Sequence, residues 1–127
     1  MSGMKTILTT AIVAAFCTGA AQAEVDLPQV FAGCAGRLSA EMERSWLMSK
    51  PDATHYEAQR ASFQTLLDAV VPHEDQRSIL IYRIETKIAH ASLLTTADFG
   101  VDAARAERAR KIAQQHVAAC EMLLLGA

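Results

Sequence analysis

The sequence predicts an all-α protein, an up-down four-helix bundle with one disulfide joining the first and last helices. Four segments carry apolar residues at helical spacing, and Pro and Gly fall mostly between these segments. Two cysteines, Cys34 and Cys120, lie near the outer ends of the first and last segments. In an up-down bundle these two ends lie at the same level, so the cysteines can pair.

Residues 1–23 predict a cleaved secretory signal peptide. Lys5 precedes an uncharged, mostly apolar run at 7–17, and Ala21 and Ala23 form an A-x-A cleavage site. Two alternatives stay open, a lipoprotein modified at Cys17 and an uncleaved anchor, although the run is shorter than the about 20 residues that span a bilayer. Cleavage after Ala23 leaves one helical domain, 24–127, that we expect to be periplasmic or secreted.

The charge of this domain argues against one class of partner. Without residues 1–23 the chain has 11 Lys and Arg against 14 Asp and Glu, a net charge of −3. This is the wrong sign for general nucleic-acid affinity. No second apolar stretch is long enough to cross a membrane, so we expect no transmembrane segment after signal cleavage.

The first helix is predicted over 28–49, because Asp26 and Pro28 suit a helix start. Gly33 and Gly36 lower its helix propensity, and we expect them to allow close approach of a neighbouring helix. Its apolar face comprises Leu27, Phe31, Cys34, Leu38, Met42 and Trp46.

A break at 49–53 precedes the second helix, which is predicted to start at a capping box, Thr54-x-x-Glu57, and to end at Val71 before Pro72. Its apolar face comprises Tyr56, Phe63, Leu66, Leu67 and Val70.

The third helix is predicted from the acid-rich turn 73–76 to about Leu94. The β-branched content of 79–84 leaves a strand possible there, but the spacing favours a helix. The predicted core face comprises Leu80, Ile81, Ile84, Ile88 and Ala91. His90 points away from that face, so we expect it to be solvated.

The fourth helix is predicted to begin at Asp98 or Asp102 and to run to about Leu125. Its inner face is made mostly of small residues, which predicts close packing: Ala106, Ala109, Ala113, Val117, Cys120 and Leu124.

Cys34 and Cys120 are predicted to pair because each lies on the inner face of its helix at matching depth. The bridge closes a loop of 87 residues, for which chain entropy predicts roughly 4–5 kcal/mol of stabilisation before strain. Two buried free thiols are the alternative. Because the chain has no C-x-x-C, the cysteines fit neither haem attachment nor a zinc site.

Few residues suggest chemistry. His116 lies one turn from Cys120, and Arg37 and Glu41 fall near its level, so a small polar site is possible beside the disulfide. The alternative is a histidine at the edge of the core that makes an ordinary hydrogen bond. We predict no catalytic residues, no metal ligands and no cofactor, and these residues favour a binding protein over an enzyme.

Two surfaces are candidates for interactions. Arg105, Arg108 and Lys111 recur every third residue as a basic stripe, which suits an acidic partner, lipid headgroups or an anionic polymer, the alternative being a solvated face. A short apolar turn lies near the end of the chain, a docking candidate unless it merely frays. Its residues include Met122, Leu123 and Leu125.

The sequence therefore predicts a small exported helical protein, non-enzymatic, that binds a macromolecule or serves as an accessory subunit. Its partner would be an unidentified protein or a second copy of itself. The alternative is a bundle that binds a small apolar ligand or cofactor in an internal cavity. That cavity would be lined by Phe31, Trp46, Phe63 and Ile84.

Overall fold

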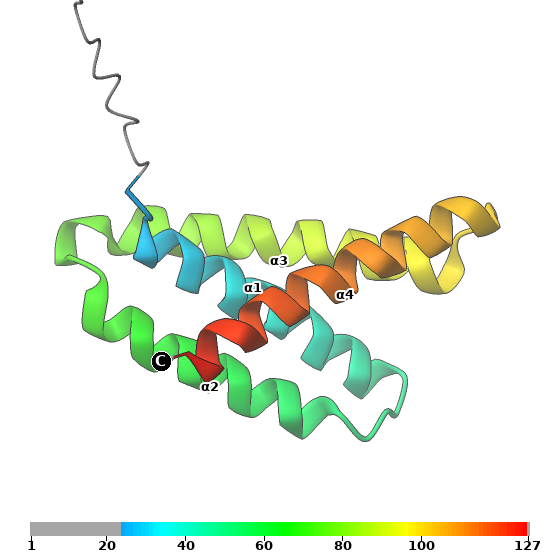
Figure 1. Ribbon diagram of the computed structural model, residues 1–127, viewed down its shortest axis with the longest axis horizontal. Helices are drawn as coiled ribbons and strands as arrows, with labels where there is room; N and C mark the ends of the chain where they lie inside the picture. The colour runs from blue at the N-terminus through cyan, green and yellow to red at the C-terminus, as the bar shows by residue number, and fades with distance from the viewer. Residues whose placement is uncertain (1–23, 127) are drawn as a thin grey trace, which may run out of the picture.

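The computed structural model describes residues 24–126, which form four α-helices and no strand (Figure 1). They are α1 (Leu27–Leu47), α2 (Ala53–Val70), α3 (Gln76–Phe99) and α4 (Ala103–Leu125), with a short 3₁₀ turn, η1 (His73–Asp75), before α3. The predicted all-α bundle is confirmed. The predicted signal peptide, 1–23, lies outside the described residues.

Two helix starts follow their sequence signals. The Asp26 side chain accepts a hydrogen bond from the Gln29 N–H at 3.2 Å, and the Asp102 side chain accepts one from the Arg105 N–H at 3.0 Å. Each aspartate satisfies a backbone donor of the first turn that has no partner within the helix. Asp102, rather than Asp98, therefore caps α4.

Two other predicted boundaries are wrong. The capping box at Thr54 and Glu57 is not used, because α2 already begins at Ala53 and its N-cap, Asp52, makes no side-chain cap bond. The third helix continues past Leu94 to Phe99, and residues 79–84 lie within it, so they form no strand. Continuing α3 carries Asp98 onto the helix, where it contacts α1.

α1 is the central helix of the bundle. It is buried almost continuously from Ala32 to Met42 and packs mainly against α2 and α3, while α4 crosses it obliquely (Figure 1). Gly36 permits the close contact with α3, since a Cβ there would collide with the backbone carbonyl of Arg83. The predicted role of this glycine in close helix approach is confirmed.

The main core lies where α1, α2 and α4 meet. The Phe31 and Phe63 rings lie 6.0 Å apart, and Phe63 is fully buried. The predicted disulfide is present: Cys34 and Cys120 have a Cα–Cα distance of 5.6 Å. It joins α1 to α4 within this core, whose buried members are Ala32, Cys34, Ala35, Leu38, Phe63, Leu67, Val117 and Cys120.

α4 packs as its sequence predicts. Its small residues face inward, and a second buried cluster joins Ala113 to Ala40 of α1 and Leu94 of α3. Five of the six predicted residues are buried, and the sixth, Leu124, packs partly buried against the core.

No helix among residues 24–126 is both long and apolar enough to cross a membrane.

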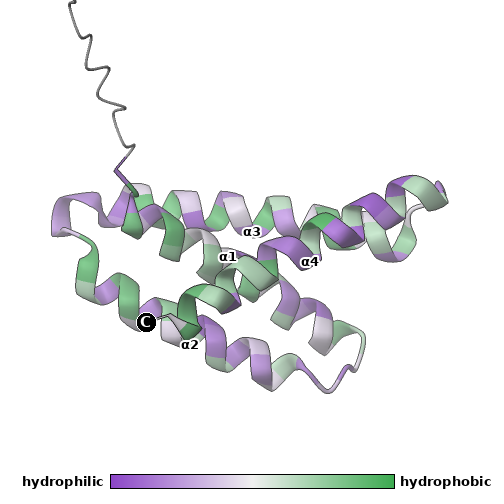
Figure 2. Cartoon of the chain, viewed as in Figure 1, coloured by the Kyte–Doolittle hydropathy of each residue, from purple (hydrophilic) through white to green (hydrophobic). Residues whose placement is uncertain are grey.

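α3 does not pack as predicted. Figure 2 shows hydrophobic and hydrophilic residues interspersed along this helix. Its fully buried residues are His90, Leu94 and Ala97, whereas Ile81, Ile84 and Ile88 of the predicted core face are exposed. His90 and Ile81 are nine residues apart, which is about two and a half turns, so they lie on opposite faces. The predicted orientation of α3 is therefore wrong.

Polar contacts between α1 and α3 explain why α3 has this orientation. They join Glu41 to His90 at 2.9 Å, Glu43 to Lys87 at 2.5 Å and Arg44 to Asp98 at 2.6 Å. A carboxylate buried on α1 is stable only if it finds a partner. Meeting that need turns the polar face of α3 inward and its isoleucines outward.

Candidate functional site

An apolar ridge runs along the outer face of α3. We define the α3 ridge as Leu80, Ile81, Ile84 and Ile88, whose exposed fractions are 52%, 48%, 48% and 64%. Ile81, Ile84 and Ile88 are spaced by three and four residues, the spacing of a coiled-coil seam. The ridge thus has the pattern of a helix that packs against another helix, although no helix among residues 24–126 covers it.

A shallow apolar groove adjoins the C-terminal end of the ridge. It has a volume of about 260 Å³ and lies between the C-terminal halves of α1 and α3. Its lining combines apolar side chains, among them Leu47, Met48 and Phe99, with the charged side chains of Glu43, Arg44 and Asp98. Leu47 and Phe99 are themselves largely exposed, so apolar surface continues beyond the ridge on this side.

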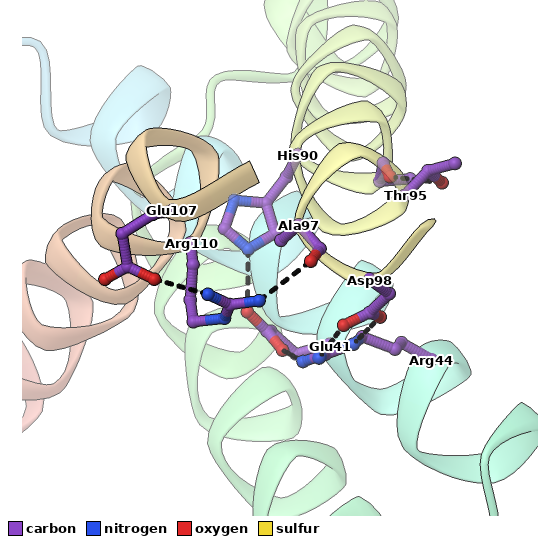
Figure 3. Close-up of polar contacts among 9 residues, drawn as sticks. Glu41, Arg44, His90, Thr95, Ala97, Asp98, Glu107 and Arg110 are labelled. Carbon is purple, nitrogen blue, oxygen red and sulfur yellow. Dashed lines mark hydrogen bonds and ion pairs between the residues drawn. The ribbon is translucent and has the colours of Figure 1, made fainter. Parts of the chain in front are cut away.

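A buried polar network lies on the opposite face of α3 (Figure 3). His90 is 1% exposed, and its Nε2–H donates to Glu41 Oε1 at 2.9 Å. Glu41 also lies 3.6 Å from the Arg44 guanidinium, which forms a bidentate pair with Asp98. The hydrogen bond from Arg44 holds the pKa of Asp98 below its ordinary value. The network fixes the rotation of α3 about its axis.

The predicted polar site is only partly assembled. The histidine that is hydrogen-bonded to Glu41 is His90, not His116. The centroid of the His116 ring lies 5.9 Å from that of the His90 ring. Burial, and next the positive charge of Arg37, lower the pKa of His116. Sequence reasoning missed His90. The signal for it was Glu41, a carboxylate on the same helical face as Cys34, Leu38 and Ser45, which therefore requires a buried partner.

A cleft of about 470 Å³ lies beside the network, and all four helices contribute to its walls. Arg44, Lys50 and Arg110 bring positive charge to its lining, and Glu41 and Glu121 bring negative charge. Burial, and next the charge of Glu41, raise the pKa of Tyr56 to about 12, so this phenol stays protonated. Because charges of both signs line the cleft, the lining selects no single class of ligand.

The four residues predicted to line an apolar cavity do not meet. Phe31 and Phe63 pack together in the core, whereas Trp46 and Ile84 are about half exposed. The geometry thus gives no support to the predicted internal ligand cavity. Among residues 24–126, no three His, Cys, Asp or Glu side chains gather as metal ligands.

The two predicted surface patches lie on α4. Arg105, Arg108 and Lys111 are exposed, and none of them forms an ion pair with another residue of 24–126. Near the C-terminal end the apolar side chains of Met122, Leu123 and Leu125 are also exposed. These patches remain candidate interaction surfaces.

Comparison with known protein families, with curated proteins and with solved structures gave no significant match. We therefore infer function from the geometry of this chain. Of the surfaces described, the α3 ridge has the clearest requirement for a partner, because isolated exposed apolar residues are ordinary and an aligned row of them is not.

Proposed function

We propose that this is an exported, non-enzymatic protein that binds another protein chain through the α3 ridge, as an accessory subunit or in a dimer. The observation that carries the proposal is the ridge itself. Four large aliphatic side chains are about half exposed in a row, on a helix that buries a histidine instead. Covering the exposed half of each would contribute roughly 1 kcal/mol per residue to association.

The spacing of the ridge favours a helical partner. The segment from Leu80 to Ile88 has nine residues and rises about 12 Å along the axis, and its three isoleucines have seam spacing. A partner helix with its own apolar stripe fits such a row, as in helix-in-groove recognition. The adjoining apolar groove extends the surface available to that helix.

Two features support export. The Cys34–Cys120 disulfide is of a kind that persists in oxidising compartments and is rare in the cytosol. The N-terminal segment also has the composition of a secretory signal peptide. Intact mass of the natural product before and after reduction tests both: the proposal predicts loss of residues 1–23 and a gain of two hydrogens on reduction.

The non-enzymatic part is supported by the burial of His90, which does not line the neighbouring cleft, whereas Glu41 does. Glu41 and His90 have the spacing of an acid–base pair, but they are 5% and 1% exposed. A histidine so enclosed cannot approach a substrate unless the helices separate, and a general base must lie within hydrogen-bond reach of the proton it removes. We therefore assign the network a structural role.

Site-specific photo-crosslinking in the native organism tests the proposal. A photoreactive residue at position 84 lies on the ridge, and one at exposed Thr65 of α2 is the matched control. We expect a defined crosslinked product from position 84 and none from position 65. If position 84 gives no product, or if both positions give the same products, the ridge is not a specific binding surface.

A further inference from the structure

We propose that the partner of the α3 ridge is the same ridge of a second copy, packed antiparallel across a two-fold axis. This inference rests on the proposed function, because it names the protein that covers the ridge. It follows from two properties of α3, the order of its apolar residues and the position of two exposed charges, Arg77 and Glu85.

The apolar residues of the ridge are self-complementary. If two copies of α3 run antiparallel with the axis between Tyr82 and Arg83, Ile81 of each copy lies opposite Ile84 of the other. Ile88 then lies opposite the aliphatic stem of Arg77, and Leu80 borders the same seam. In this arrangement the two kinds of seam position, a and d, face each other across the interface, as they do in antiparallel coiled coils. Four isoleucines then lie at the centre of a two-fold interface.

Two charges, Arg77 within the seam and Glu85 at its edge, complement each other in the same register. Arg77 and Glu85 are exposed, and neither has an ion-pair partner among residues 24–126. Antiparallel pairing brings Arg77 of each copy within reach of Glu85 of the other, which gives two intermolecular ion pairs. Parallel pairing would instead set Arg77 against Arg77, so the charges select the antiparallel arrangement.

The remaining charges along the ridge are compatible with this arrangement. Lys87, on the opposite edge from Glu85, is already paired with Glu43 at 2.5 Å. Exposed Glu74 and Asp75 lie just before the N-terminal end of the ridge. Acidic residues at this position disfavour an anionic lipid surface, which attracts basic residues. A protein surface is therefore the better match, and the chain itself supplies one of the right pattern.

The first test is the mass of the protein in solution. The full coding sequence is expressed with export, and the purified product is examined by sedimentation from low micromolar to several hundred micromolar. We expect a reversible dimer. Ile84→Glu should weaken dimerisation by about tenfold or more, whereas Met122→Glu, at a more exposed apolar site on α4, should leave it unchanged.

The second test is a charge exchange. Arg77→Glu and Glu85→Arg should each weaken the dimer, and the double variant should restore it, because the ion pair re-forms with its signs reversed. Both positions are exposed, so neither change should disturb folding. Failure of the double variant to recover the wild-type affinity would overturn the antiparallel register.

The experiments distinguish a failure of the self-association from a failure of the proposed function. A protein that stays monomeric over the whole range, or a dimer that Ile84→Glu does not weaken, overturns self-association. If position 84 then crosslinks to a different protein, the ridge is still a binding surface and only its partner was wrongly named. A crosslink from position 84 to a second copy of this chain supports both proposals.

Discussion

α3 and α4 are neighbouring helices of similar length, but they bury different kinds of side chain. α4 turns its small apolar residues inward and its Arg and Lys residues outward. α3 turns His90 inward and leaves Ile81, Ile84 and Ile88 outside. The difference lies in what α1 offers each helix. Towards α3 it presents Glu41, Glu43 and Arg44, which need polar partners, and towards α4 it presents Ala40 and Cys34.

This comparison shows that the most apolar face of a helix is not always its core face. Burying a carboxylate without a partner costs more than leaving an isoleucine half exposed. Once Glu41 is placed on the central helix, α3 must present His90 to it. The exposed isoleucines then become available for contact with another chain.

The largest expected effect is on the free energy of unfolding when the disulfide that joins α4 to α1 is removed. α4 packs mainly against α3, and apart from the disulfide it has few contacts with α1 and α2. Cys34→Ser should therefore lower the free energy of unfolding by about 4–5 kcal/mol, the chain-entropy value for a loop of this length. Chemical denaturation with and without reductant measures it. The double variant Cys34→Ser/Cys120→Ser should match the reduced protein, and a loss below about 1 kcal/mol would contradict the account.

The next effect concerns the polar face of α3. Glu41→Ala should destabilise the protein by about 3 kcal/mol, because it leaves the buried Nε2–H of His90 without its acceptor and opens a cavity on α1, while Arg44 keeps its pair with Asp98. Glu43→Ala, which breaks a partly exposed pair with Lys87, should cost no more than about 1 kcal/mol. Denaturant unfolding compares the two. Equal losses would mean that the buried network does not determine the rotation of α3.

A smaller effect separates two glycines of α1. Gly36→Ala should cost about 1–3 kcal/mol, because its Cβ meets the backbone of α3 at Arg83 and Lys87. Gly33→Ala meets only side chains at 3.5 Å and beyond, an ordinary contact, and should be close to neutral. Thermal unfolding of the two variants measures the difference. A harmless Gly36→Ala would show that α1 and α3 are not in close contact.

The smallest effect is a dependence on pH. The pKa of His116 is below its ordinary value of 6.5, chiefly because of burial and then because of Arg37. The unfolded chain therefore takes up this proton more readily than the folded protein does. The free energy of unfolding should fall as the pH drops through about 6.5, and this contribution should level off below the folded pKa. His116→Gln should reduce the slope of the unfolding free energy against pH, measured by denaturant unfolding at a series of pH values.

The fold was largely predictable, and the orientation of α3 was not. Cysteine positions, helix breaks and the small face of α4 each report on local structure, so they predicted the helices and the bridge. The orientation of α3 depends instead on residues far away in sequence. The single local sign was Glu41 on the apolar face of the first helix, because a carboxylate there implies a buried partner. Apolar periodicity in α3 predicted a face that needs covering, but it did not distinguish the core from another chain.

The most direct test of the reversed packing of α3 is the unfolding midpoint measured as a function of protein concentration. For the wild type we expect the midpoint to rise with concentration, because association through the ridge stabilises the folded state. The triple variant Ile81→Gln/Ile84→Gln/Ile88→Gln should lose this dependence and stay within about 1 kcal/mol of the dilute wild type. A triple variant that loses about 3 kcal/mol or more at every concentration would contradict the account. Such a loss would place the isoleucines in the core of the monomer.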